Sequence, residues 1–208
     1  MNGLGLLITL DGPGGAGKTT TSRHLARLLA DRGHHVHAIA QPSTDELGRI
    51  ARAHSDRYSG YALACLVAAD RYHQQLTEIR PHRAAGHTVV CDRYVASSLV
   101  LQHIDGVPLD FLTALNAAVD PPDLSVILTT TPDTAAARVA QRGTHHRFHN
   151  GPASAAREMD LYLLARHRLN HATLLVDTTQ QDPERVAEII ASRVAEPRTP
   201  VEPGPATA

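Results

Sequence analysis

The sequence predicts an α/β domain in which helices cover both faces of a parallel sheet. Two observations lead to this fold class. Short apolar runs without polar alternation recur along the chain, which is typical of parallel strands buried on both faces. Stretches with helical periodicity lie between these runs, so strand and helix alternate. The 208 residues are enough for one such domain with a sizeable core, and we expect it to span residues 1–196.

Five apolar runs are the predicted strands. Four of them are strong and lie at 6–11, 88–92, 124–130 and 173–179, and a weaker fifth lies at 35–40. The sequence therefore predicts a five-stranded parallel sheet flanked by helices, with no internal repeat.

Helix start and stop signals bound the segments between the strands. Leucines recur on one helical face after residue 18, and Gly33 can end that helix. Thr-Pro at 131–132 and Asp-Pro at 182–183 each offer a cap followed by a first-turn proline. Gly143 can close the first of these two helices. Residues 59–85 should be mostly helical, with Pro81 bending or restarting the helix.

Composition narrows the function classes. A formal net charge of −1 argues against a long nucleic-acid partner, and no apolar run approaches the length of a membrane span. Cys65 and Cys91 have neither a disulfide framework nor metal-ligand spacing. We therefore expect a soluble, cytoplasmic protein without a secretory signal or a membrane partner. Residues 197–208 are rich in proline and are expected to form a disordered tail.

The segment LDGPGGAGKTT at 10–20 matches the phosphate-binding pattern G-x-x-x-x-G-K-[ST]. It follows a predicted strand and opens a predicted helix, which argues against a glycine-rich turn that binds nothing. Glycines let backbone N–H groups converge on phosphate oxygens, and the helix N-terminus adds partial positive charge. The predicted ATP-binding residues are Gly12, Gly14, Gly15, Ala16, Gly17, Lys18, Thr19, Thr20 and Arg138.

A second polar pair follows the strand at 88–92. Asp92 ends that strand at the sheet edge where the phosphate loop lies, which is the edge where ligands collect in open α/β sheets. We expect Thr19 and Asp92 to hold Mg²⁺, and Arg93 to grip a phosphate. The alternative is an ion pair between Asp92 and Arg93 that serves only the strand end.

Several segments together resemble the thymidylate kinase family. The run DRYVASSLVLQ at 92–102 is similar to the family's D-R-[YH]-x-x-S-S-x-x-x-Q pattern. The upstream AADR at 68–71 resembles a family helix, PPDL at 121–124 resembles a family strand, and HHRFH at 145–149 takes the place of the D-R-F-E of the family's lid. The resemblance covers residues from about 6 to 190.

This resemblance implies a nucleoside monophosphate kinase that transfers the γ-phosphoryl group of ATP, with Mg²⁺, to the 5′-phosphate of dTMP. It also implies a homodimer and a mobile lid at about 142–153. The predicted catalytic residues are Lys18, Asp92, Arg93, Arg142 and Arg147. The predicted acceptor-binding residues are Pro42, Arg49, Arg52, Val67, Arg71, Arg93, Ser98 and Gln102.

The need for positive charge supports the lid assignment independently. Phosphoryl transfer is catalysed mostly by positioning and by positive charge, and two anionic substrates must meet. The phosphate loop has Ala16 where an arginine would help, so we expect Arg138, Arg142 and Arg147 to supply the charge. The alternative is a solvated loop in which these arginines are incidental.

Three departures from the family pattern leave the acceptor open. Gly14 stands where the family usually has an acidic residue that contacts the acceptor sugar, and Val67 stands where it often has a stacking phenylalanine. The arginine near Pro42 is absent, and we expect Arg49 or Arg52 to compensate. A lost sugar hydrogen bond is worth about 0.5–1.5 kcal/mol and a lost stacking ring about 1–3 kcal/mol. The alternative acceptor is therefore another or a modified pyrimidine nucleotide.

Two other classes of function compete with this one. A nucleoside kinase would have a neutral acceptor, and Arg71 and Arg93 argue against it. A regulatory module that binds ATP without transferring phosphate is disfavoured because Lys18, Thr19, Asp92 and Arg93 are all present. The histidine clusters at 34–37 and 145–149 lack cysteine or carboxylate partners at ligand spacing, so we interpret them as surface histidines.

Overall fold

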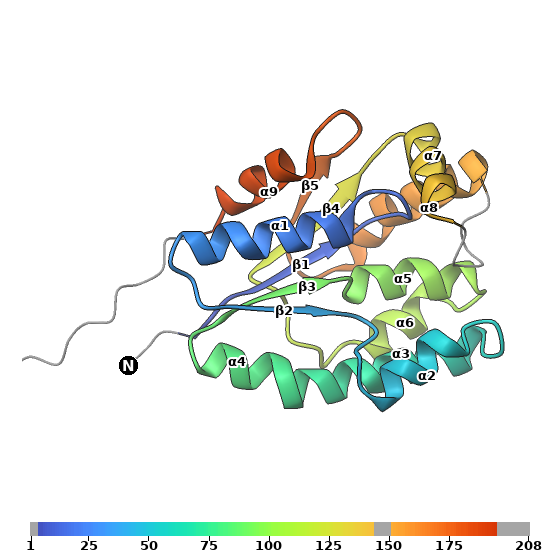
Figure 1. Cartoon of the computed structure of the whole chain (residues 1–208). Helices are drawn as coiled ribbons and strands as arrows, with labels where there is room; N and C mark the ends of the chain where they lie inside the picture. The colour runs from blue at the N-terminus through green and yellow to red at the C-terminus, as the bar shows by residue number, and fades with distance from the viewer. Residues whose placement is uncertain (1–3, 144–150, 195–208) are drawn as a thin grey trace, which may run out of the picture.

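The computed structural model describes residues 4–143 and 151–194. Within these residues the strands form a five-stranded parallel sheet in the order β2-β3-β1-β4-β5. The strands are β1 (Leu7–Asp11), β2 (Val36–Ala40), β3 (Thr88–Asp92), β4 (Leu124–Thr129) and β5 (Thr173–Asp177). The prediction of a five-stranded parallel sheet flanked by helices is confirmed. β1 lies at its centre and is the strand that leads into the phosphate loop (Figure 1).

Helices cover both faces of this sheet. α1 and α9 lie on one face, and α3, α4, α5, α6 and α8 lie on the other (Figure 1). The helices are α1 (Lys18–Asp31), α2 (Glu46–Ala53), α3 (Gly60–Gln74), α4 (Arg80–Ala84), α5 (Val95–Ile104), α6 (Leu109–Leu115), α7 (Pro132–Arg142), α8 (Gly151–Ala165) and α9 (Pro183–Ala191). A π-helical turn (Gln75–Ile79) joins α3 to α4, and a short 3-10 helix (Arg166–Arg168) follows α8.

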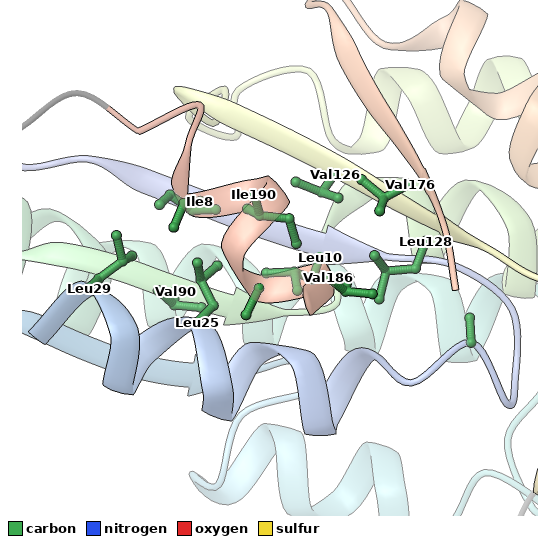
Figure 2. Packing of buried hydrophobic residues seen from close by; sticks show 13 residues of the cluster. Ile8, Leu10, Leu25, Leu29, Val90, Val126, Leu128, Val176, Val186 and Ile190 are labelled. Carbon is green, nitrogen blue, oxygen red and sulfur yellow. The ribbon is translucent and has the colours of Figure 1, made fainter. Parts of the chain in front are cut away.

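The core has a separate layer on each face of the sheet. On one face Leu25 and Leu29 of α1 and Ile190 of α9 pack against Ile8 and Leu10 of β1 (Figure 2). On the other face a second cluster joins strand β4 to helices α5, α6 and α8. Because successive strand residues point to opposite faces, an apolar run with no polar alternation fills both layers. This is why the strand runs lack the alternating pattern of a half-exposed sheet.

The predicted helix boundaries agree with the structure. Gly33 follows α1 with a φ of 87°, and Gly143 follows α7 with a φ of 84°. Thr131 caps α7, because its Oγ1 accepts a hydrogen bond from the backbone N–H of Thr134 at 3.3 Å. Pro81 lies in the first turn of α4, where its missing N–H is tolerated, so the stretch 59–85 is helical throughout most of its length.

The predicted domain bounds, lid and tail stay predictions. The predicted lid at about 142–153 begins on the last residue of α7 and ends in the first turn of α8, and residues 144–150 between these helices lie outside the described residues. The predicted tail at 197–208 lies outside them too. In the part of the chain that is described, no helix is long and apolar enough to cross a bilayer.

Candidate active site

The phosphate loop joins β1 to α1 at the carboxyl edge of the sheet. Gly12 has a φ of 141° and Gly15 has a φ of 80°, which side chains with a Cβ rarely adopt. A Cβ on Gly12 would lie 2.4 Å from the carbonyl oxygen of Leu128, and one on Gly15 would lie 2.4 Å from that of Ala135. Neighbouring backbone therefore excludes any larger residue at either position. The loop conformation is fixed by space as well as by φ.

The inner surface of the loop is ready to receive an anion. The backbone N–H groups of Gly15 and Gly17 donate no hydrogen bond within residues 4–143 and 151–194. Lys18 is buried, and its Nζ donates a hydrogen bond to the carbonyl oxygen of Pro13 at 2.7 Å. Burial lowers the pKa of Lys18 to about 7, and the positive charge of Arg93 lowers it too. A bound phosphate would reverse that shift, because an adjacent anion favours the protonated amine.

Thr19, in the first turn of α1, is hydrogen-bonded to Asp92 at the end of β3. The Thr19 hydroxyl donates a hydrogen bond to Oδ2 of Asp92 at 2.5 Å. Oδ1 of the same carboxylate is buried and has no hydrogen-bond partner among the described residues. Hydroxyl and carboxylate oxygens are the ligands that Mg²⁺ prefers, and Mg²⁺ usually keeps several waters. The pair that the sequence predicted as metal ligands therefore fits a divalent cation.

Arg93 has an unusual backbone. Its φ of 72° is the one positive value of a non-glycine residue in the described part of the chain. Such a conformation costs free energy and often marks a functional position. Its Nη1 lies 3.4 Å from the Ser97 hydroxyl, and no ion pair joins it to the described carboxylate of Asp92. Burial disfavours the charge of Arg93, but nearby groups, including the carboxylates of Asp92 and Glu158, raise its pKa.

A pocket of about 360 Å³ opens beside Arg93. Seven of the eight predicted acceptor-binding residues line it, namely Pro42, Arg52, Val67, Arg71, Arg93, Ser98 and Gln102. The eighth, Arg49, is exposed and lines a separate hollow with Glu46 and His54. Tyr94, which lines the pocket, is an aromatic residue that could stack on a base in place of the phenylalanine missing at Val67. Tyr61 instead packs edge-to-face on Phe111 at the surface.

Arg71 is held rigidly at the base of this pocket. Its Nε donates to Oε1 of Gln41 at 2.7 Å, and its Nη2 donates to the Ser98 hydroxyl at 2.7 Å. Its Nη1 donates to Oδ1 of Asn116, and a weaker bond reaches the carbonyl oxygen of Tyr94 at 3.3 Å. Burial lowers the pKa of Arg71, but these partners solvate its charge. Gln41 and Asn116 are site residues that the sequence reasoning missed.

Asp11 joins the phosphate loop to the pocket. This residue ends β1, and its Oδ1 accepts hydrogen bonds from the backbone N–H groups of Tyr94 and Ser97, each at 2.9 Å. The same oxygen accepts the Ser97 hydroxyl at 2.6 Å. The carboxylate thereby satisfies free N–H groups at the start of α5. The sequence contained a signal for Asp11 as a site residue, because it is an acidic residue at the end of an apolar strand.

Glu158 of α8 is a second site residue that the sequence reasoning missed. It is 1% exposed, and its Oε2 accepts a hydrogen bond from the backbone N–H of Gly14 at 3.0 Å. The two residues are 144 positions apart in the chain. No local pattern around residue 158 indicates this contact. Gly14 thus lacks a side chain, but a carboxylate from another helix reaches its N–H.

The predicted arginines of the lid segment fall into three cases. Arg138 contacts the phosphate loop, because its Nη1 lies 3.3 Å from the carbonyl oxygen of Gly15, and its Nη2 donates to that of Thr178 at 2.8 Å. Arg142 is exposed and donates to the carbonyl oxygen of Arg138 at 3.4 Å, so the structure does not bring it to the loop. Arg147 lies outside the described residues.

The predicted ATP-binding residue Thr20 is exposed on α1, and its side chain makes no hydrogen bond to the loop within the described residues.

The histidines at 34–37 are not part of this site. His37 stacks on His82, with 3.5 Å between the ring centroids, and its Nε2 donates a hydrogen bond to Oε1 of Glu78 at 2.7 Å. Across residues 4–143 and 151–194, no group of three or more histidine, cysteine or acidic side chains could hold a metal ion. The histidines at 145–149 lie outside these residues.

Comparison with known proteins identifies the family. A family model described as thymidylate kinase matches residues 10–190. A probable thymidylate kinase of Pyrococcus horikoshii is 34% identical over 152 residues, which cover 69% of this chain and 74% of the relative. One of Caldivirga maquilingensis is 29% identical over 173 residues, covering 81% and 84%. A thymidylate kinase of Xanthomonas oryzae is 38% identical over 141 residues, covering 67% and 62%. The chain therefore belongs to the thymidylate kinase family of nucleoside monophosphate kinases.

Proposed function

We propose that this protein transfers the γ-phosphoryl group of ATP to the 5′-phosphate of dTMP, forming dTDP and ADP. The observation that carries the proposal is the junction of two sites at one sheet edge. The phosphate loop ends at Lys18, the second pocket begins at Arg93, and Asp92 lies between them. An enzyme that joins two phosphates needs a cation for each, at facing ends of two nucleotide sites.

The loop and Arg93 divide the anionic charge between them. The amides of the loop and Lys18 bind the phosphates of ATP, while Arg93 holds the phosphate of the acceptor in line with them. Arg138 lies close enough to the loop to add charge on the ATP side. Transfer then depends on positioning and on fixed positive charge rather than on a protein nucleophile.

Mg²⁺ is proposed as the cofactor. Thr19 and Asp92 would hold it, since they offer a hydroxyl oxygen and a carboxylate with one unpartnered buried oxygen. When bound, the ion would neutralise phosphate charge and orient the β- and γ-phosphates. The role assigned to these two residues is supported by their meeting at the strand ends.

The pocket also favours a thymine base. Gln102 lines it, and Oε1 of this side chain is buried without a hydrogen-bond partner among the described residues. An acceptor oxygen can take a hydrogen bond from the ring N–H of thymine. Leu63, Val67 and Leu101 supply an apolar wall. These side chains support dTMP as the acceptor, although Val67 cannot stack on the base.

The test is ADP formation by the purified full-length protein. We expect turnover with ATP plus dTMP, little with dCMP, and none with thymidine or with ATP alone. Lys18→Ala should abolish turnover while the fold is retained. Faster turnover with another nucleotide than with dTMP would replace the proposed acceptor but keep the kinase. ATP binding without acceptor-dependent turnover on any nucleotide would show a regulatory module instead.

We also propose that the protein works as a homodimer, as the family resemblance implies. The exposed ring pair of Tyr61 and Phe111 supports this, because exposed aromatic side chains are typical of interfaces. Sedimentation equilibrium measures the mass directly. A monomer mass at micromolar concentration would contradict the proposal.

A further inference from the structure

We propose that Glu158 is a positioning residue of the phosphate site, because its buried carboxylate occupies the N–H of Gly14 and so sets where along the loop the phosphates of ATP bind. The inference rests on the proposed function of the loop as an ATP site. It assigns a role to a residue that lies outside the phosphate-binding motif.

The geometry fixes the carboxylate against the loop. Oε2 of Glu158 lies 3.0 Å from the backbone nitrogen of Gly14, and both residues are buried. Tyr162 follows one helical turn later on the same face of α8. Its hydroxyl lies 3.0 Å from that of Ser97, which begins the wall of the acceptor pocket. α8 is therefore attached at two points, one on each half of the site.

The contact changes what the loop can bind. Converging backbone N–H groups form the anion site of a phosphate loop. Here the N–H of Gly14 already donates to the carboxylate of Glu158. A phosphate oxygen that bound this N–H would have to displace the carboxylate and would be repelled by its negative charge. The N–H groups of Gly15 and Gly17 have no such partner in the described chain. Phosphate binding is thereby restricted to the part of the loop from Gly15 to Lys18.

The charge of Glu158 reaches two further groups. It interacts with the buried cations Lys18 and Arg93, which serve the two phosphates in the proposed reaction. A negative group near both cations weakens the attraction of the empty site for any anion. Free phosphate compounds that bind in the wrong register lose most from this, since they have no nucleoside to compensate.

The test separates register from charge with three variants. Glu158→Ala removes both the hydrogen bond and the charge, and Glu158→Gln keeps an oxygen that can accept from Gly14 but removes the charge. Asp160→Asn, an exposed position on the same helix, is the matched control for net charge. Calorimetry with inorganic tripolyphosphate measures anion binding, and steady-state assays with ATP and dTMP give kcat.

The expected signature is tighter binding with slower turnover. We expect Glu158→Ala to bind tripolyphosphate roughly 5-fold more tightly and to have a kcat roughly 10-fold lower, and Glu158→Gln to change both in the same directions but less. Asp160→Asn should match the wild type in both measurements. General damage to the site would weaken binding and turnover together.

Several outcomes overturn the inference. If binding and kcat fall together, or if neither changes in Glu158→Gln, Glu158 does not set the phosphate register. Glu158→Gln carries the test alone if Glu158→Ala fails to fold, since glutamine has the same shape. A wild type that binds tripolyphosphate but does not phosphorylate dTMP would refute the proposed function only, because the binding measurement still decides the role of Glu158.

Discussion

The phosphate loop and the acceptor pocket are built in opposite ways, although they share one sheet edge. The loop is a continuous segment whose shape depends on backbone conformation and on neighbouring backbone that would lie 2.4 Å from a Cβ added at Gly12 or Gly15. The pocket is assembled from side chains between Gln41 and Gln102, and hydrogen bonds from Arg71 hold it together. Substitutions in the loop should therefore destabilise it by steric clash. Substitutions in the pocket should destabilise it by removing hydrogen-bond partners.

The largest expected effect is on the loop. Gly15→Ala should destabilise the fold by about 3 kcal/mol, because the added methyl group meets a carbonyl at a φ that alanine rarely adopts. Gly106→Ala is the matched control, since Gly106 has a similar φ of 88° but no atom within 4 Å of the added group. It should lose only about 1 kcal/mol. Urea unfolding measures both, and equal losses would show that space does not limit the loop.

The next effect tests the pocket. Asn116→Ala removes a partner of the buried Arg71 guanidinium from outside the pocket wall. It should destabilise the protein by about 2 kcal/mol, as expected for a buried charge that loses a hydrogen bond. In assays the KM for dTMP should rise while the KM for ATP stays the same. A parallel rise in both constants would mean that the two regions are not independent. Asn170→Ala, at an exposed asparagine, is the control.

A smaller effect is expected at Gly14, where the loop contacts the Glu158 side chain of α8. Gly14→Asp would put a second carboxylate beside that of Glu158, and like charges in a buried site repel. We expect a loss of about 1–2 kcal/mol that is largely relieved in the Gly14→Asp, Glu158→Gln double variant. A double-mutant cycle of unfolding free energies measures this coupling. Additive losses would indicate that the two side chains do not face each other.

The smallest effect concerns the surface behind the pocket. A hydrogen bond from Arg80 lowers the pKa of Asp120 below its ordinary value of 3.8. A depressed folded-state pKa contributes stability that is present above 3.8 and is lost as the pH falls through the folded pKa. Arg80→Met should therefore melt slightly below the wild type at pH 6, and the melting curves should converge in strong acid. A constant gap at all pH values would exclude this ion pair as the cause.

The contrast between the regions also explains what the sequence could predict. Lys18 and Thr19 were predicted from the phosphate-loop motif, and Asp92 was predicted because it ends an apolar strand at the same sheet edge. The contact of Thr19 with Asp92 agrees with the rule that parallel strands end at one edge. Gln41 and Asn116 were not predicted as site residues, because no local pattern shows which side chains will contact Arg71 in the folded chain.

Other parts of the candidate site show where residue type misleads. Arg49 and Arg52 both offered positive charge near Pro42, but only Arg52 lines the pocket. Their spacing of three residues puts them on neighbouring parts of α2, so the helical pattern cannot tell them apart. Gly14 leaves the loop without an acidic side chain of its own at this position. It gave no sign that Glu158 would place a carboxylate there from α8, because tertiary contacts of this range leave no periodic signal.

The three hydrogen bonds to Asp11 have a mechanical consequence. They tie the end of β1 to the first turn of α5, so three hydrogen bonds join the phosphate loop to the helix that borders the pocket. In the proposed reaction this link would help to keep the spacing between the two nucleotide phosphates constant. Helix α8 strengthens the same link, because Glu158 contacts the loop and Tyr162 contacts Ser97.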